Sequence, residues 1–224
     1  AWRSLASYEG LKRYFANTSW MLMGQAISLI LGFFVGAYIA RYLGPENFGL
    51  MNYAISFASL FGFLCGFGVD SILSRELIKY PEKKQELLGA GFWIKFSGGL
   101  LAALIINVVS FFVHDNPLIR TLVFVFSITC ITQSVGVIGI FFQSQVLSKR
   151  VVGAQTIVAL LSAGVKMVLI WLHANVIWLT SMYVFDTVCL GVLLLCLFYK
   201  HESGRVSFAT SRQMIRGLLA DSFP

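Results

Sequence analysis

Several stretches of the sequence are apolar over the roughly 20 residues that an α-helix needs to cross the hydrocarbon core of a membrane. Inside a bilayer every backbone N–H and C=O must bond within the protein, so only helices and closed barrels can span it. These stretches are continuously apolar and lack the alternation of a barrel strand. Charged residues make up only 12% of the chain, about half of what covers a soluble domain. The sequence therefore predicts an all-α integral membrane protein.

The apolar stretches predict a bundle of six transmembrane helices. We expect these spans at Ser19–Tyr42, Phe48–Ile72, Leu87–Val113, Leu118–Phe142, Val151–Leu172 and Val176–Phe198. Pro45 should end the first span and Pro117 should begin the fourth, because proline lacks the N–H donor that a helix interior needs. The link at residues 173–175 is so short that the fifth and sixth spans should form an antiparallel hairpin.

The Lys and Arg residues predict the orientation of the bundle. Arg41 and Arg120 lie on one side of the expected spans, and Lys95 and Lys166 lie within them. The other side holds Arg3, Lys12, Arg13, Arg75, Lys79, Lys83, Lys84, Lys149, Arg150, Lys200, Arg205, Arg212 and Arg216. By the positive-inside rule that side is cytoplasmic, which gives an N-in, C-in topology. The net charge of +7 follows from this pattern of loops, and we do not expect nucleic acid as a partner.

Three segments follow from this topology. Residues 1–18 form a cytoplasmic N-terminal segment, residues 19–198 the transmembrane bundle, and residues 199–224 a basic cytoplasmic linker. In the linker, Ser211 can serve as a helix N-cap. A narrow apolar stripe of Met214, Ile215, Leu218 and Leu219 predicts a short helix on the membrane surface. Because the chain begins with Ala1 and stops at Ser222-Phe223-Pro224, we interpret it as a fragment of a longer protein.

Small and polar residues recur at helical spacing within three of the spans. The first carries Gly24, Ser28, Gly32, Gly36 and Ala40, a row that predicts a tight helix–helix seam. The second carries Asn52, Ser56, Ser59, Gly66 and Asp70, and the fifth carries Gln155, Ala159, Ser162 and Lys166. These two polar stripes either bond to neighbouring helices or line a watery cavity, and both alternatives remain open.

Charged residues within the spans are the sharpest functional signal. Lys95, Lys166 and Asp186 would each cost about 2.5–3.5 kcal/mol at mid-membrane, so each should face the bundle interior or a wet cavity. One alternative is a structural ion pair between Lys166 and Asp186 on adjacent helices. Another is a cationic, water-filled path for an anionic substrate, and a third is a protonatable Asp186 in ion coupling.

Motifs of metal-dependent, hydrolytic or nucleotide-dependent enzymes are missing from the sequence. It contains no HExxH, GxSxG or P-loop, and its four cysteines lie singly in apolar runs. His114, His173 and His201 each stand alone in a loop or in the tail. We therefore expect neither an enzyme nor a metal or cofactor site.

Residues 40–54, with the sequence ARYLGPENFGLMNYA, resemble the first extracytoplasmic turn of the polysaccharide flippases. These proteins export lipid-linked O-antigen and teichoic-type units and belong to the multidrug/oligosaccharidyl-lipid/polysaccharide transporter superfamily. GVD at 68–70, SREL at 74–77 and Asn17-Thr18 are also similar to that family, so its specific motifs are confined to residues 17–77. The rhythm of helices agrees along the whole chain.

The resemblance implies a transporter of twelve to fourteen helices in two similar lobes around a cavity with alternating access. This chain would be the N-terminal lobe, and Ser222 would lie near the start of a seventh helix. A second lobe or a second copy of the chain must complete the cavity. The implied location is the cytoplasmic (inner) membrane of a bacterium or archaeon.

Our leading hypothesis is a flippase for polyprenyl-(pyro)phosphate-linked oligosaccharides. By their polarity and depth, candidate residues of the substrate path are Arg41, Lys95 and Lys166 for phosphates or acidic sugars, and Asn52, Ser56, Ser59 and Gln155 for sugar hydroxyls. Asp70 or Asp186 would carry coupling protons. The expected partners are the lipid-linked substrate, the surrounding lipids and the second lobe or copy.

Three other functions remain as alternatives. A cation-coupled multidrug exporter of the same superfamily would favour acidic cavities, which the two buried lysines oppose. A membrane-embedded enzyme of polyprenyl-phosphate glycan metabolism would need clustered acids in a cytoplasmic loop, whereas Glu82 and Glu86 lie among basic residues. A purely structural subunit would have little need of three charges within its spans.

Overall fold

The computed structural model describes residues 2–66, 68–202, 211 and 214–218, with residues 2–14, 16 and 202 described by their backbone alone. Five helices in this part of the chain are long and apolar enough to cross a membrane: Asn17–Ser59, Pro81–Val113, Pro117–Ser144, Ser148–Trp171 and Val176–His201. The prediction of an all-α protein with several membrane-spanning helices is confirmed. The bent helix Asn17–Ser59 is counted once here, although it contains the whole first predicted span and the beginning of the second.

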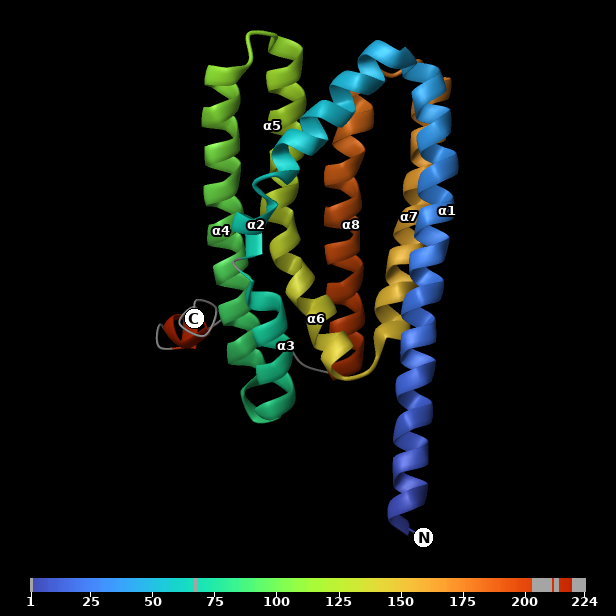
Figure 1. Cartoon of the computed structure of the whole chain (residues 1–224), viewed down its shortest axis with the longest axis vertical. Coiled ribbons are helices and arrows are strands. Elements are labelled where there is room, and N and C mark those ends of the chain that lie inside the picture. The colour runs from blue at the N-terminus through green and yellow to red at the C-terminus, as the bar shows by residue number, and fades with distance from the viewer. Residues whose placement is uncertain (1, 67, 203–210, 212–213, 219–224) are drawn as a thin grey trace.

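Helix α1 runs from Trp2 to Ser59 and has two arms, which meet at a sharp bend (Figure 1). The bend lies at Gly44, whose φ of 72° and ψ of 170° are not helical, and Pro45 follows it. Glycine adopts a positive φ without steric cost, and proline begins a new helix well. The predicted stop at Gly44-Pro45 is therefore the turn between the arms. The predicted N-terminal segment, residues 1–18, is helical from Trp2 and continues into the first arm.

The predicted second span, Phe48–Ile72, is divided rather than continuous. The second arm of α1 ends at Ser59, α2 covers only Gly62–Gly66, and α3 begins at Val69 and ends at Lys79. Gly68 adopts a φ of 69° just before α3. Three glycines within seven positions lower the helix propensity here, which explains the interruption. Apolarity alone could not reveal it, because the residues between these glycines are still hydrophobic.

The remaining helices agree closely with the predicted spans. They are η1 (Pro81–Lys83), α4 (Lys84–Val113), α5 (Pro117–Thr132), η2 (Gln133–Gly136), α6 (Val137–Ser144), α7 (Ser148–Trp171) and α8 (Val176–Glu202). Asn116 caps α5 by accepting a hydrogen bond from the Leu118 N–H, next to Pro117 in the first turn. The 3₁₀ segment η2 interrupts the predicted fourth span between α5 and α6.

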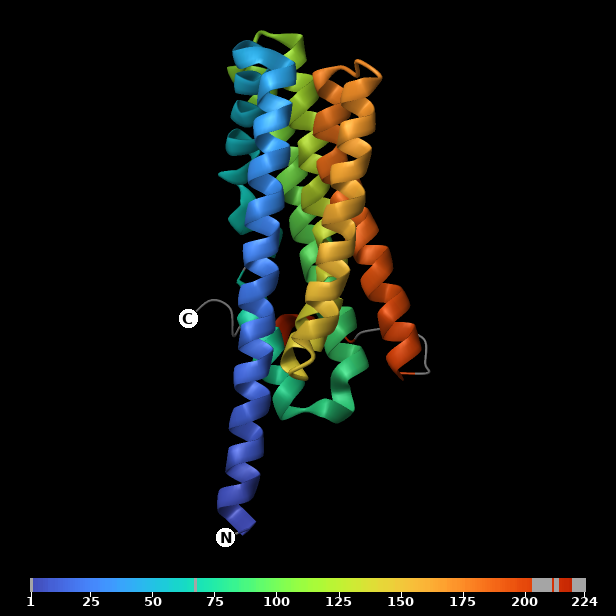
Figure 2. The same ribbon diagram turned by 90° about the vertical axis from the view of Figure 1, so that its right-hand side faces the viewer.

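The long helices pack side by side, with α4 against α5, α5 against α8, and α7 against both α8 and α1 (Figures 1 and 2). Two hydrogen bonds tie distant parts of the chain together. Asn17 on α1 accepts a bond of 2.9 Å from the Ser148 N–H at the start of α7. Tyr42, close to the bend of α1, donates a bond of 3.0 Å to the Ala174 carbonyl in the α7–α8 turn.

Most of the buried apolar side chains in the described part of the chain belong to one of two clusters. One contains Met51, Ala58 and Cys65 together with residues of α4, α5, α7 and α8 near the bend of α1. The other contains Val69 and Leu77 of α3 with residues of α4, α6, α7 and α8. The interruption between α2 and α3 lies where one cluster gives way to the other.

The predicted surface helix of the tail is helical over residues 214–218. Leu218 is buried, and Met214 and Ile215 pack against the cluster that contains α3 and α6. Met214, Ile215 and Leu218 therefore pack this segment against the helices of the bundle. Leu219, the fourth residue of the stripe, and Ser222-Phe223-Pro224 lie outside the described residues.

The small residues of α1 do not form the continuous tight seam that their spacing predicts. A Cβ atom added to Gly24 would lie 2.5 Å from Val152 Cγ1 on α7, so α1 and α7 do approach closely there. A Cβ atom on Gly32 or Gly36 would meet nothing within 4 Å. The prediction of a seam is therefore right at Gly24 and wrong at Gly32 and Gly36, where the missing side chains leave open space.

The closest helix approach that depends on a glycine joins α4 to α5. A Cβ on Gly99 would collide with the backbone carbonyl of Cys130, and backbone atoms cannot move aside as a side-chain end can. We expect Gly99→Ala to lower the free energy of unfolding by about 1–3 kcal/mol, as for other overpacked sites. Thermal unfolding of the purified protein in detergent measures this. The control is Gly164→Ala on α7, where nothing lies within 4 Å; an equal loss in both variants would contradict this account.

Candidate functional site

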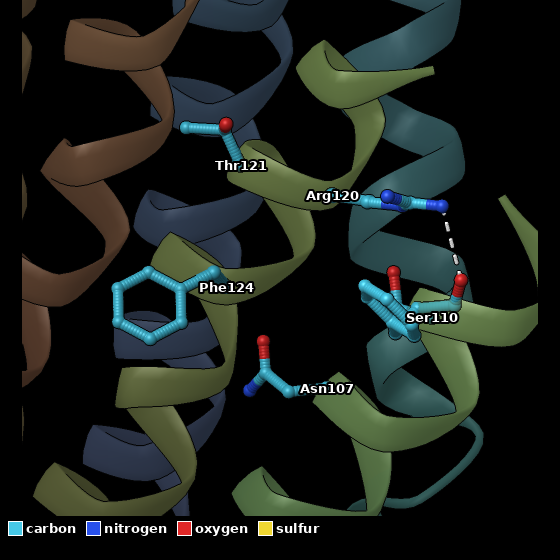
Figure 3. A pocket seen from close by; sticks show the side chains of 6 residues that line it. Asn107, Ser110, Arg120, Thr121 and Phe124 are labelled. Carbon is cyan, nitrogen blue, oxygen red and sulfur yellow. Dashed lines mark hydrogen bonds between the residues drawn. The ribbon is translucent and has the colours of Figure 1, made fainter. Parts of the chain in front are cut away.

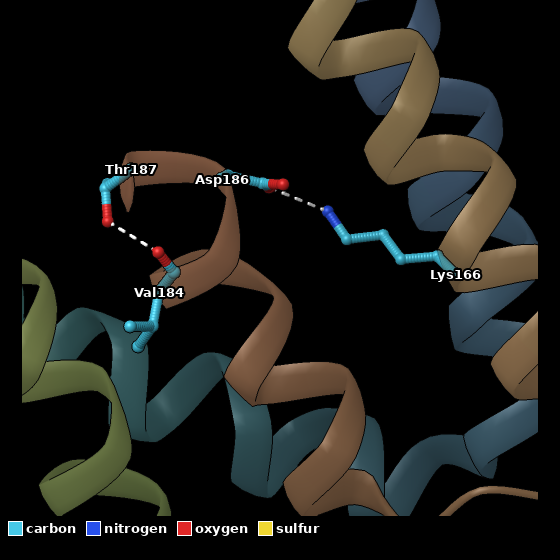
Figure 4. Close-up of polar contacts among 4 residues, drawn as sticks. All are labelled: Lys166, Val184, Asp186 and Thr187. Carbon is cyan, nitrogen blue, oxygen red and sulfur yellow. Dashed lines mark hydrogen bonds and ion pairs between the residues drawn. The ribbon is translucent and has the colours of Figure 1, made fainter. Parts of the chain in front are cut away.

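Lys166 of α7 and Asp186 of α8 point toward each other and form an ion pair (Figure 4). The Lys166 Nζ lies 3.1 Å from Asp186 Oδ2, and the two side chains are 12% and 29% exposed. The same ammonium lies 5.2 Å from the centre of the Tyr183 ring, a cation–π distance. The structural ion pair offered by the sequence as one alternative is thus formed. Pairing offsets much of the cost of placing these two charges within the spans.

The pair lines a hollow of about 220 Å³ between α1, α7 and α8, which we call the α1–α7–α8 hollow. Its lining consists of Ser28, Leu31, Gly32, Val35, Gly36, Ile39, Ala159, Ser162, Ala163, Lys166, Tyr183 and Asp186. The hollow exists because Gly32 and Gly36 contribute no side chain on the α1 side. The lining is mostly apolar, with Ser28, Ser162, Lys166, Tyr183 and Asp186 as its polar members, and a space of this size can hold several water molecules.

Two polar atoms at this hollow have no hydrogen-bond partner among the described residues. They are Ser162 Oγ, whose residue is only 2% exposed, and Asp186 Oδ1, the carboxylate oxygen that does not face Lys166. An unsatisfied buried polar atom costs about 1–3 kcal/mol, so such atoms normally find water or a ligand. The hollow therefore presents an unused hydroxyl and an unused carboxylate oxygen beside an ammonium.

Lys95 of α4 forms a second ion pair, with Asp70 of α3, across the divided second span. The Lys95 Nζ lies 2.6 Å from Asp70 Oδ1. The Lys95 side chain is 12% exposed, and that of Asp70 is 58% exposed. This pairing was not predicted. Neither residue has an unpartnered buried side-chain atom in the described part of the chain.

The other predicted path residues lie on the surface of the bundle. Arg41 is exposed and lines a hollow of about 330 Å³ with Tyr38, Tyr42 and Ile170. Within the described part of the chain, Arg41 makes no hydrogen bond or ion pair. Gln155 is exposed on α7 and does not line the α1–α7–α8 hollow, unlike the other three residues of its stripe.

The polar stripe of the second arm of α1 is also exposed. Asn52 donates a hydrogen bond to the Phe48 carbonyl at 2.9 Å, and Ser59 donates one to the Ile55 carbonyl at 2.7 Å. Together with Ser56, these side chains share one face of the helix without contacting another helix through a described hydrogen bond. On α1 the stripe makes no described hydrogen bond to another helix, whereas Asp70, the last residue of the predicted stripe, is paired with Lys95 of the neighbouring helix α4.

His114, which the sequence left alone in a loop, is a buried junction between α1 and α4. Its Nε2 lies 2.7 Å from the Tyr53 hydroxyl, and its Nδ1 lies 3.2 Å from the Ser110 carbonyl. The ring also packs edge-on against Phe57. Nothing in the sequence signals these contacts, because they depend on how the second arm of α1 lies against the end of α4.

Arg120 lies at the same end of the bundle and binds carbonyls at the C-terminal end of α4. Its Nε donates a hydrogen bond of 2.6 Å to the His114 carbonyl. Its Nη2 donates one of 3.0 Å to the Phe111 carbonyl, which is the dashed line at Arg120 in Figure 3. These are carbonyls at the C-terminal end of α4, which have no partner within the helix. A hollow of about 370 Å³ is lined by Asn107, Ser110, Phe111, Arg120, Thr121 and Phe124. Since the guanidinium is engaged by the helix end, we do not assign this hollow to the site.

The structure thus brings together Lys166 and Asp186, with Ser162 and Tyr183 added, and separately Lys95 and Asp70. It does not bring Arg41, Asn52, Gln155 or Lys95 to the α1–α7–α8 hollow. Ser162 was part of a predicted stripe, but Tyr183 was missed. Its spacing of three from Asp186 on α8 was the signal that could have revealed it.

One family model matches residues 14–224, and its description is polysaccharide biosynthesis protein. No curated protein and no solved structure matches the chain. The match covers nearly all of the described helices, and it includes the segment at residues 17–77 on which the resemblance to polysaccharide flippases rested.

Lys166 and Asp186 should contribute to stability as a unit. We expect a double-mutant cycle with Lys166→Met and Asp186→Asn to give a coupling energy on the order of 1–3 kcal/mol, because either single change leaves one charge unpaired. Unfolding of the purified protein in mixed micelles measures it. The cycle with Lys95→Met and Asp70→Asn should give a smaller coupling, since Asp70 is 58% exposed. Equal couplings, or none for Lys166 and Asp186, would contradict this expectation.

Proposed function

We propose that this chain, which belongs to the polysaccharide biosynthesis protein family, is one lobe of a flippase for lipid-linked oligosaccharides. Members of this family are generally transporters rather than enzymes. The chain itself is a multi-pass membrane protein. The substrate would be a glycan on a polyprenyl (pyro)phosphate, moved across a bacterial or archaeal cytoplasmic membrane by alternating access. Its polyprenyl tail would remain in lipid while the polar head crosses through the protein, which avoids burying phosphates in hydrocarbon.

The proposal includes six membrane crossings with both ends in the cytoplasm. The crossings are the first arm of α1, its second arm with α2 and α3, then α4, α5 with α6, α7, and α8. Two features support this count: the bend at Gly44-Pro45 lets α1 supply two crossings, and each later connection lies at a predicted loop. The positive-inside bias of the Lys and Arg residues supports the orientation.

The observation that carries the proposal is the uncovered polar face on the second arm of α1. Asn52, Ser56 and Ser59 are exposed on one side of a helix that lies at membrane depth. Polar side chains at that depth face protein or water rather than lipid tails. A second lobe, or a second copy of this chain, would enclose that face and make it one wall of an aqueous path for sugar hydroxyls.

Arg41 is the cation best placed to attract the phosphates or acidic sugars of the substrate. It has no ionic partner in the described part of the chain, whereas Lys95 and Lys166 are each balanced by an aspartate. The preference for an anionic substrate over a cationic drug therefore rests mainly on Arg41. Lys95, Lys166 and Gln155 remain candidates for the path if the aspartates release the lysines during transport, and Asp70 and Asp186 remain candidates for ion coupling.

Reporter fusions test the six crossings. We expect alkaline phosphatase to be active, and green fluorescent protein dark, when fused after Asn47, Asp115 or Ala174. The reverse should hold after Lys83, Leu147 or Glu202, because these positions alternate between the two sides of the membrane. A phosphatase-active fusion after Leu147 with an inactive one after Asp115 would overturn the proposed orientation.

Export measurements test Arg41. We expect Arg41→Ala in the natural full-length transporter to reduce surface glycan several-fold, because the unpaired cation at the end of the path is lost. Arg41→Lys should retain a substantial part of export, since the positive charge is kept. The amount of protein in the membrane is measured in parallel. Normal export by Arg41→Ala at normal abundance would remove Arg41 from the path.

A further inference from the structure

Two of the four cysteines, which lie in different apolar runs of the sequence, are brought together by the fold. Cys65 lies on α2 and Cys130 near the end of α5, and the two thiols are hydrogen-bond partners of each other. Both residues belong to the apolar cluster near the bend of α1, and they are only 6% and 4% exposed. Both thiols are free in this structure, and the candidate site uses neither of them.

The helices that carry the two thiols are packed on a common neighbour. The backbone of α5 comes so close to α4 that the Cys130 carbonyl would collide with a Cβ on Gly99. Helix α2 packs on α4 as well and also contacts α5. A disulfide requires neighbouring backbones and side chains that point at each other. Thiols in mutual contact, on two helices held by the same third helix, are oriented as this bond requires.

We propose that Cys65 and Cys130 are a redox-active pair, which a neutral, lipid-soluble two-electron oxidant of the quinone or azo class converts into a disulfide between α2 and α5. The inference goes beyond the proposed function and does not depend on it. It assigns a modification site to this chain, together with the chemical class of the reagent that acts there.

The oxidation is balanced by the oxidant alone. The S–H bonds of Cys65 and Cys130 break and one S–S bond forms, which releases two electrons and two protons. A quinone takes up both electrons and both protons to become a quinol, and an azo N=N bond takes them up to become a hydrazine.

Burial selects the class of oxidant. The two thiols lie among apolar side chains of the spans, such as Ala102, Ile106 and Val123. A charged oxidant such as oxidised glutathione would have to leave water to reach them, and moving an ionised group into apolar surroundings is costly. A neutral molecule that dissolves in the bilayer has no such barrier.

The disulfide would join two interrupted spans close to their interruptions. Cys65 lies just before the break between α2 and α3, and Cys130 lies just before η2. The part of the chain between the two cysteines contains all of α3 and α4. A link across so long a loop lowers the conformational entropy of the unfolded chain, and it therefore stabilises the folded state when the native positions fit the bond.

Peptide mapping of the natural sequence tests the pair directly. The purified protein in liposomes is treated with diamide, a neutral azo compound, and the remaining thiols are blocked with N-ethylmaleimide. Peptides are then analysed by mass spectrometry without reduction. We expect most of the protein to contain Cys65 linked to Cys130, and dithiothreitol to reverse the link. Recovery of both residues as maleimide adducts would overturn the proposal.

Two controls test the position of the pair and the class of oxidant. Phe63 lies on the same short helix but is 72% exposed, so Phe63→Cys combined with Cys65→Ala should give no link to Cys130. Oxidised glutathione added to intact liposomes of the natural sequence should also give none. An equal yield from the displaced cysteine would overturn the pairing, and an equal yield with oxidised glutathione would overturn the class of oxidant.

Thermal unfolding tests whether the folded positions fit the bond. We expect diamide to raise the Tm of the natural sequence in detergent by several degrees, and dithiothreitol to reverse the rise. Cys130→Ala should show no rise, because the pair is lost. An unchanged or lower Tm in protein that carries the link would contradict the fit. No glycan enters these measurements, so their failure is separate from a failure of the export tests.

Discussion

An unpaired charge within a bilayer is so costly that each ionic side chain at membrane depth must be explained by its partner. In this bundle Lys166 is held by Asp186 and Lys95 by Asp70, and both pairs join neighbouring helices. The helix ends obey the same requirement, since Arg120 satisfies the last carbonyls of α4 and Asn17 a free N–H of α7. The positions of these helices thus depend on a small number of polar contacts, because lipid supplies no hydrophobic force to press one helix onto another.

Glycine has two opposite uses in the same bundle. At Gly24 and Gly99 the missing side chain lets two helices approach closely. At Gly32 and Gly36 it leaves space, which the Lys166–Asp186 pair borders. Spacing of small residues along a helix cannot distinguish these uses, because the difference lies in the neighbouring helix. At Gly24 the neighbour on α7 is Val152, whereas farther along α7 the facing residues are alanines and a serine.

The long apolar helices and most of their ends could be predicted from the sequence, because hydrophobic length and proline act locally. The first arm of α1 stops at Gly44-Pro45 and α5 begins at Pro117, as expected. The pair of Lys166 and Asp186 was predictable from the sequence, since a short turn makes α7 and α8 antiparallel neighbours. The pair of Lys95 and Asp70 was not, because it depends on the interruption before α3. The burial of His114 and the α1–α7–α8 hollow depend on the relative positions of three or more helices, which no local pattern encodes.

The division of the apolar core has a mechanical consequence. Cys65 and Cys130 belong to one cluster, and Val69 and Val137 belong to the other. Between Cys65 and Val69 the helix is interrupted by the glycine-rich segment before α3. Between Cys130 and Val137 it is interrupted by η2. In the described structure α4, α7 and α8 pass through both clusters as continuous α-helices, and the first arm of α1 runs alongside them, bonded to α7 at Asn17 and to the α7–α8 turn at Tyr42. The two interrupted spans are therefore the ones that bend most easily where the two clusters meet.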